Sequence, residues 1–337
     1  MITQNSSQRE GFRARIRRFA FHDSVDNPEA WRCFAVLLML LLNIPALEAQ
    51  LYIDGAPIII NQSSRAEGLG LSYVSESVEP SGMYWNPASL AFTNGIQFSL
   101  GMYQVWDGQY ASVYGNGSAQ LSKRHAIGIG FRHIPYGTDW TSPTLVYQSM
   151  DVGYSFRVLD VLSIGVLAMM SKAQTYSQDV FTVFSSVGLF YAPSSGIRYG
   201  ITFEGIGNGV DYSRYTLERK RGISRSLRMG ASYSYPATRS HKMLTMAISG
   251  EKQFGMDGYT YYLGLEVSPF NFVDLRIGYV EKPDESLYYT SGGRYGLGLK
   301  IGSFGIDYVT SPSLSALRHH QVTFRLRLQR DTLEPGP

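Results

Sequence analysis

The six histidines, the single cysteine and the serines are the first side chains to test for catalysis. A nucleophilic serine needs a histidine base beside it, and many hydrolases carry that serine in a G-x-S-x-G turn, which does not occur here. His319 and His320 are adjacent, so on a strand they point to opposite faces and cannot bind one metal from one side. Neither a phosphate-binding loop nor a dinucleotide fingerprint is present. We therefore expect no enzyme, no metal site and no cofactor.

Charged residues instead recur at alternate positions, opposite apolar ones. Val322, Phe324 and Leu326 share one face of the last such segment, and Arg325 and Arg327 share the other. This alternation predicts one polar face that collects charges along most of the chain. The residues on that face are Asp151, Glu204, Glu266, Asp274, Asp307, Arg132, Arg157, Arg198, Arg228, Arg276, Arg294, Lys300, Arg325 and Arg327.

Two interpretations of these charges stay open. Their positive excess could favour anions in a pore or hold an inserted segment. Alternatively, they pair across neighbouring strands and only satisfy one another; Asp307 and Arg325 are on adjacent predicted strands, as are Asp274 and Arg294. The same face is rich in glycine, which leaves room for an inserted segment or a ligand, or permits tight curvature. These glycines are Gly128, Gly130, Gly153, Gly165, Gly188, Gly230, Gly264, Gly296 and Gly298.

The elements that carry this pattern are fourteen predicted antiparallel strands between residues 95 and 330. Short connections, such as 236–239 before a strand at 240–250, alternate with longer ones, such as 207–224. Short turns at one end and longer loops at the other are typical of an outer-membrane β-barrel. Alternation alone also fits a periplasmic sandwich or solenoid. The apolar faces nearly lack charge, and fourteen strands are too many for a comfortable open sheet, so we expect an all-β transmembrane barrel in the bacterial outer membrane.

Aromatic residues near predicted strand ends support this interpretation, because membrane barrels carry aromatic girdles at both interfaces. These residues are Tyr103, Trp106, Tyr110, Tyr147, Tyr191, Tyr235, Tyr259 and Tyr289. The formal net charge of +3 is too small and scattered to indicate a partner nucleic acid.

The N-terminus has the order of a secretory signal. A basic region with Arg13, Arg15, Arg17 and Arg18 precedes the apolar run 33–42, and Ala49 offers a cleavage site, although a buried N-terminal helix is the alternative. We predict a signal peptide with an extended basic region over 1–49, an N-terminal hatch over 50–94, the barrel over 95–330 and a C-terminal tail over 331–337. The hatch is expected inside the barrel lumen as a plug, because prolines and a loop-like run interrupt 50–94.

The hatch region also carries a family resemblance. Gly68-Leu-Gly70, Tyr73 and then Trp85-Asn86-Pro87-Ala88 resemble the hatch of the FadL-type outer-membrane transporter superfamily, closest to its short PorV/PorQ-like members. The resemblance implies a fourteen-stranded barrel with an N-terminal hatch, and it marks Asn86, Pro87 and Ala88 as the hatch motif. Proline holds Asn86 extended, which leaves the amide side chain free to bond hatch backbone. The longest loop, 207–224, departs from the family because it is polar and basic.

Three functions follow from the resemblance and the pattern. The barrel could pass hydrophobic or amphipathic small molecules across the outer membrane past the hatch. It could instead act as an accessory of protein secretion of type IX that binds secretion-system proteins without solute flux, or as a scaffold. Membrane lipid and lipopolysaccharide are expected partners, and Arg219, Lys220 and Arg221 are candidate contacts with lipopolysaccharide phosphates, unless they form an ordinary solvated loop.

Overall fold

The computed structural model describes most of the predicted barrel and the part of the N-terminal segment next to it. The described residues are 62–105, 111–137, 143–175, 179–193, 196–207, 225–236, 243–254, 257–270, 272–282, 291–312 and 318–328. The predicted signal peptide over 1–49, residues 50–61, the basic loop with Arg219, Lys220 and Arg221, and the tail over 331–337 lie outside these ranges.

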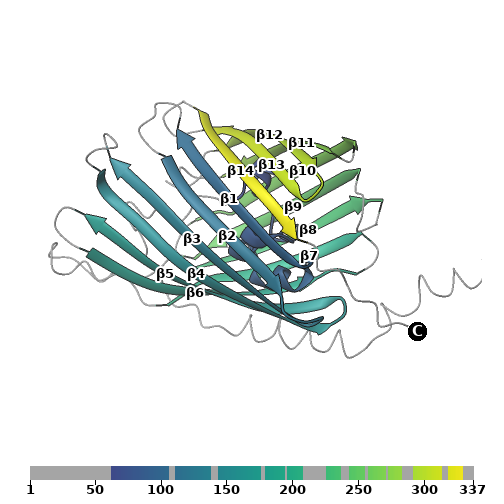
Figure 1. Cartoon of the computed structure of the whole chain (residues 1–337), viewed down its shortest axis with the longest axis horizontal. Helices are drawn as coiled ribbons and strands as arrows, with labels where there is room; N and C mark the ends of the chain where they lie inside the picture. The colour runs from purple at the N-terminus through teal and green to yellow at the C-terminus, as the bar shows by residue number, and fades with distance from the viewer. Residues whose placement is uncertain are drawn as a thin grey trace, which may run out of the picture. The chain divides into compact units, whose positions relative to one another are not determined.

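Fourteen antiparallel strands form a closed barrel, in which each strand pairs with its sequence neighbours and β1 pairs with β14 (Figure 1). This confirms the predicted strand number and closure. The strands are β1 (Ile96–Val105), β2 (Ala111–Gln120), β3 (His125–Gly137), β4 (Pro143–Leu159), β5 (Leu162–Thr175), β6 (Asp179–Tyr191), β7 (Ile197–Gly207), β8 (Ser226–Tyr235), β9 (Leu244–Gln253), β10 (Thr260–Phe270), β11 (Val273–Glu281), β12 (Gly292–Ile301), β13 (Phe304–Pro312) and β14 (Arg318–Leu328).

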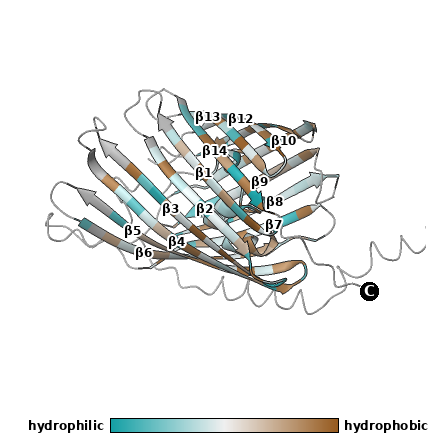
Figure 2. Cartoon of the chain, in the orientation of Figure 1, coloured by the Kyte–Doolittle hydropathy of each residue, from teal (hydrophilic) through white to brown (hydrophobic). Residues whose placement is uncertain are grey.

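Alternation of side chains gives the barrel a polar inside and an apolar outside. On β14, Phe324 is 51% exposed, whereas its neighbour Thr323 is 2% exposed. Successive residues of a strand point to opposite faces, so the same alternation recurs on every strand (Figure 2). The outward face carries leucine, isoleucine, valine, methionine and aromatic side chains that remain exposed to the surroundings.

Two predicted details were wrong. The ninth strand begins at Leu244 rather than at 240, and residues 237–242 lie outside the described ranges. Tyr147 does not belong to an outer girdle: it is buried, and the guanidinium of Arg132 lies 5.7 Å from its ring centroid. The reason is register, because Tyr147 shares its strand face with the buried Ser149 and Asp151.

Residues 62–94, here named the inner segment, lie inside the barrel and are almost wholly buried. They form one short α-helix, α3 (Ser64–Gly68), and two 3₁₀ helices, η2 (Pro80–Tyr84) and η3 (Pro87–Phe92). Ser63 caps α3 by accepting a hydrogen bond from the backbone N–H of Ala66, at 3.2 Å. Within the described ranges, no helix is long and apolar enough to cross a membrane.

Candidate functional site

The contact between the inner segment and the barrel wall is the candidate functional site. Along much of this contact, backbone lies directly on backbone. A Cβ atom added at Gly278 would lie 1.9 Å from the nitrogen of Gly70, and one added at Gly165 would lie 2.4 Å from the nitrogen of Ala88. Real Cβ atoms do not approach so closely, so only glycine fits at these wall positions.

Close approach of the inner segment also explains most of the other inward glycines. The inner segment also lies within contact distance of the Cβ position of Gly128, Gly130, Gly153, Gly188, Gly200, Gly230, Gly264 and Gly296. Gly298 is the exception among the predicted set, because Arg276 and Asp307 fill its space. Of the three explanations that the sequence leaves open, room for an inserted segment accounts for this band of glycines.

Asn86 joins the two halves of the inner segment to the wall. Its side chain is fully buried. The Oδ1 atom accepts from the backbone N–H of Ala88 at 3.1 Å, which caps η3. The Nδ2 atom donates to the carbonyl of Val74 at 3.2 Å and to the carbonyl of Leu189 on β6 at 2.8 Å. Pro87 follows as the first residue of η3, where its missing N–H leaves no donor unsatisfied.

Hydroxyl groups of the wall satisfy further carbonyls of the inner segment. Ser155 and Ser163 both donate to the carbonyl of Ala88, at 2.8 and 2.6 Å. Thr202 donates to the carbonyl of Trp85 at 2.7 Å. The guanidinium of Arg157 bonds the carbonyl of Ala91. Strands β4, β5 and β7 therefore hold η3 and the residue before Asn86 by direct hydrogen bonds.

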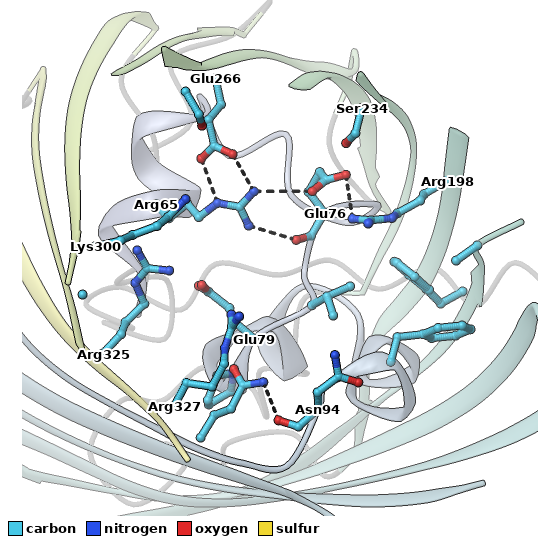
Figure 3. A pocket seen from close by; sticks show the side chains of 18 of the residues that line it. Arg65, Glu76, Glu79, Asn94, Arg198, Ser234, Glu266, Lys300, Arg325 and Arg327 are labelled. Carbon is cyan, nitrogen blue, oxygen red and sulfur yellow. Dashed lines mark hydrogen bonds and ion pairs between the residues drawn. The ribbon is translucent and has the colours of Figure 1, made fainter. Parts of the chain in front are cut away.

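Ion pairs also attach the inner segment to the wall, at β7 and at β10 (Figure 3). Arg65 on α3 donates two hydrogen bonds of 2.9 Å to the carboxylate of Glu266 on β10. It also lies 3.4 Å from Glu76, which pairs at 2.9 Å with Arg198 on β7. These charge-assisted bonds lie in a buried setting, where each partner needs the other.

The wall extends this arrangement into one connected series. Arg276 contacts three carboxylates: Glu266 at 2.6 Å, Asp274 at 2.9 Å and Asp307 at 2.7 Å. Lys300 pairs with Asp274 at 2.7 Å. Arg325 pairs with Asp307, so the series runs from Arg198 on β7 through the inner segment to β14.

The remaining predicted lumen charges have other partners. Arg294 lies on the strand next to Asp274 but pairs with Glu67 of the inner segment, at 2.9 Å. Arg228 pairs with Glu251 at 3.0 Å and with Glu204 at 3.3 Å.

Three further predicted charges, Asp151, Arg132 and Arg327, lie elsewhere on the inward face. Asp151 accepts from the hydroxyl of Tyr84 at 2.7 Å and lies 3.6 Å from Arg132. Arg327 is exposed at the end of β14.

Sequence reasoning missed the charged residues of the inner segment itself: Arg65, Glu67, Glu76 and Glu79. Their signal was present, because charged side chains in a segment expected to be buried require partners. Burial alone would raise the pKa of the Glu79 carboxyl. The nearby guanidinium groups of Arg325 and Arg65, with hydrogen bonds from Ser63 and Ser81, hold that pKa below its ordinary value.

A cavity of about 590 Å³ lies next to the inner segment, at the barrel end that carries the short turns (Figure 3). Glu76 and Glu79 of the inner segment form part of its lining, and Lys300, Arg325 and Arg327 line it from the wall. No group of three or more histidine, cysteine, aspartate or glutamate side chains in the described part of the chain is placed to hold a metal ion.

Comparison with known proteins gives the fold. No family model matches the sequence, and no curated protein matches it. The toluene transporter TbuX of Ralstonia pickettii matches with a TM-score of 0.55 at 12% identity, over 80% of this chain and 99% of that chain. The CymD monoaromatic hydrocarbon channel matches with a TM-score of 0.55 at 13% identity, over 81% and 99%.

A third match is the toluene transporter TodX of Pseudomonas putida, with a TM-score of 0.52 at 13% identity, over 82% of this chain and 97% of that chain. At such identities the likeness concerns the fold alone, an outer barrel similar to that of these three proteins.

Proposed function

We propose that this chain is an outer-membrane barrel of the FadL type that lets hydrophobic or amphipathic small molecules cross the membrane, with the inner segment as its hatch. The observation that carries the proposal is a closed barrel with an apolar outside whose lumen is occupied by one separate segment of the chain. Closure leaves no unpaired strand edge, which is the condition for a sheet to span hydrocarbon.

The outer surface supports a membrane location. Outward residues in the middle of the strands are apolar, such as Ile248, Ile277 and Leu297, each more than two-fifths exposed. On the described strands the outward-facing charges, Lys172, Asp179, Lys252 and Glu281, lie near the loop-side ends of their strands. The shortest strands have nine residues, which at ~3.3 Å per residue and a tilt of ~40° cover about 23 Å, close to the apolar band of such barrels.

The substrate class rests on two observations. The structural neighbours are described as toluene transporters and a monoaromatic hydrocarbon channel. In addition, an apolar cluster lies between the inner segment and the wall on the β3–β6 side, and apolar solutes favour such surroundings. Its buried members are Met83, Leu90, Ala126, Leu167, Met169 and Phe184.

Deletion of residues 51–90 tests the hatch. Removal of this segment should raise the single-channel conductance in planar bilayers, because it opens the centre of the barrel. Uptake of toluene and of a linear alkane into liposomes that contain the full-length protein tests passage itself. An unchanged conductance after the deletion would show that the segment is not a plug, and uptake equal to that of empty liposomes would refute transport.

An accessory role in protein secretion, of the PorV/PorQ-like kind, is the second candidate. The direct backbone contact at Gly165 and Gly278 favours it, because a segment so closely fitted keeps the lumen filled. Purification from native membranes separates the two proposals. Secretion-system proteins that copurify, together with no hydrocarbon uptake, would support the accessory role; copurified hydrophobic small molecules would support transport.

A further inference from the structure

The wall formed by β1 and β2 differs from the rest of the barrel. Its described inward residues are small or polar and uncharged, apart from two tyrosines, Tyr103 and Tyr114. Those from Gln97 to Gly101 and from Ser112 to Ser118 form what we name the polar stripe. The stripe consists of Gln97, Ser99 and Gly101 on β1 and Ser112, Tyr114, Asn116 and Ser118 on β2. Register pairs Gln97 with Ser118 and Ser99 with Asn116, so the stripe is continuous across both strands.

The end of the polar stripe at Gln97, on the short-turn side of the barrel, reaches the cavity. Gln97 lines that cavity and bonds the carbonyl of Asn94, which lines it as well (Figure 3). From Gln97 the stripe runs towards the loop side of the barrel, where Ser112 lies close to the start of β2. A connected row of hydrogen-bonding groups therefore leads from the turn-side cavity along the whole height of the wall.

Hydrogen bonding along the polar stripe is incomplete. The Oγ atoms of Ser112 and Ser118 and the Oδ1 atom of Asn116 are buried and have no partner in the described part of the chain. Both polar atoms of the Gln62 side chain are likewise buried and have no hydrogen-bond partner in the described part of the chain. Buried polar atoms without partners cost free energy that water would recover, so this contact gains from hydration.

The contact on the other side of the inner segment is different. There Ser155, Ser163 and Thr202 each donate to a carbonyl of the inner segment. Buried atoms without a hydrogen-bond partner also occur on β4, but Asp151 there bonds Tyr84 through its other carboxylate oxygen, whereas Ser112 and Ser118 on β2 have only the one unpartnered hydroxyl each. We therefore expect hydration to loosen the contact between the inner segment and β2 first.

Tyr114 closes the polar stripe. A Cβ atom at Gly101 would lie 2.2 Å from the Cζ and Oη atoms of Tyr114, so the ring lies flat across Gly101 of the neighbouring strand. Its hydroxyl accepts from the Nε2 atom of Gln321 at 2.7 Å and lies 2.7 Å from Oγ1 of Thr323. Thr323 also bonds the backbone N–H and the hydroxyl of Ser64, at 3.0 and 2.7 Å. Thr323 thus links the tyrosine to α3.

We propose that the polar stripe of β1 and β2 is a route for water and small uncharged hydrogen-bonding solutes past the inner segment, and that Tyr114 is its gate. The absence of charge from all seven side chains of the stripe suits neutral solutes, since no charged partner compensates an ion there. The inference rests on the proposed function in requiring a barrel in a membrane, and it adds a second route beside the passage of hydrophobic molecules.

Cysteine labelling tests the route without any transport assay. Cys33 is the only cysteine of the sequence, so a Cys33→Ser background gives single-cysteine variants. Ser118→Cys on the stripe is compared with Ser163→Cys, which is equally buried but donates to the inner segment. We expect a small uncharged thiol reagent to label Ser118→Cys at least about tenfold faster in liposomes, because hydration opens that contact. Equal rates would overturn the route.

Swelling of liposomes in glycerol tests the gate. Tyr114→Ala should raise the swelling rate several-fold, whereas Tyr262→Ala should not. Tyr262 is the matched control, because it is an equally buried inward tyrosine whose hydroxyl also makes a hydrogen bond, at 2.5 Å to Glu251. Heat-modifiable migration in gels confirms that each variant is folded. If Tyr114→Ala does not fold, Tyr114→Phe replaces it, because loss of the hydroxyl alone frees the ring from Thr323.

The outcomes separate this inference from the proposed function. Similar swelling for the Tyr114 and Tyr262 variants would refute the gate even if toluene uptake is intact. Faster swelling of the Tyr114 variant, with no toluene uptake by any variant, would refute the proposed substrate and leave the polar route standing.

Discussion

Gly278→Ala is the sharpest test of the close contact between wall and inner segment. The added methyl carbon would lie 1.9 Å from the nitrogen of Gly70 and 2.6 Å from the carbonyl carbon of Leu69. Ordinary contacts begin near 3.4 Å, so wall and segment must move apart by about 1.5 Å. Both neighbours are backbone atoms, which cannot rotate away as a side chain would.

The expected magnitude follows from two opposed terms. Overpacking in a well-packed interior costs about 1–3 kcal/mol, whereas alanine in a strand gains about 0.5–1 kcal/mol over glycine. We expect Gly278→Ala to lower the free energy of unfolding by about 1 kcal/mol. Gly250→Ala is the control, because the nearest atoms to its Cβ position are 3.9 Å away and only the gain applies.

Urea unfolding of the refolded barrel in lipid, followed by tryptophan fluorescence, measures both variants. Trp85 lies in the inner segment, packed against Tyr73 with ring centroids 5.3 Å apart, so it reports displacement of that segment. Equal free energies of unfolding for the Gly278 and Gly250 variants would refute the reasoning. It would mean that the segment does not rest on the wall backbone.

Three further predictions concern the bonds of the inner segment. Arg65→Ala should lower the free energy of unfolding by about 3 kcal/mol, because it leaves the buried carboxylate of Glu266 with one partner fewer. A double-mutant cycle with Glu266→Gln should show a coupling energy between the two residues, and purely additive effects would contradict the ion pair. Asn86→Ala should cost about 2 kcal/mol in the same urea assay, because two buried carbonyls lose their donor, and an unchanged midpoint would argue against that role. In the folded protein the pKa of the Glu79 carboxyl is below its ordinary value, so the ionised carboxylate stabilises the fold above the ordinary pKa, and this contribution is lost as pH falls through the folded-state pKa. Between about pH 6 and about pH 3, the Glu79→Gln variant should therefore lose less stability than the unaltered chain. Parallel pH profiles of the two proteins would exclude the contribution.

The strands could be predicted from the sequence because their information is local. The alternation of Val322, Phe324 and Leu326 with charged residues fixes which face of β14 meets the surroundings, whatever the partner strand is. The start of β9 was predicted four residues before Leu244, because alternation shows which face a residue takes but not where a strand begins. Tyr147 could not be assigned to the outer girdle or to the lumen from its residue type, because aromatic rings occur on both faces of a strand. Only its position in the strand, on the same face as the buried Asp151, assigns it to the lumen.

The site could be predicted only in outline, because its contacts join distant parts of the chain. Arg65 and Glu266 are 201 residues apart, and their pairing depends on where the inner segment lies within the barrel. The inward glycines have several explanations in sequence, and only the position of Gly70 against Gly278 decides among them. The unpartnered groups at Ser112 and Ser118 leave no trace in the sequence at all.

The band of wall glycines has a consequence for assembly. The backbone of residues 62–94 touches wall backbone at Gly165, Gly200, Gly264 and Gly278, and at other wall glycines its side chains fill the space, so little clearance remains for threading this segment into a finished cylinder. The strands must therefore wrap around a segment that is already in place. Chain order suits this sequence of events, since the segment precedes β1 and the pairing of β1 with the last strand, β14, completes the ring.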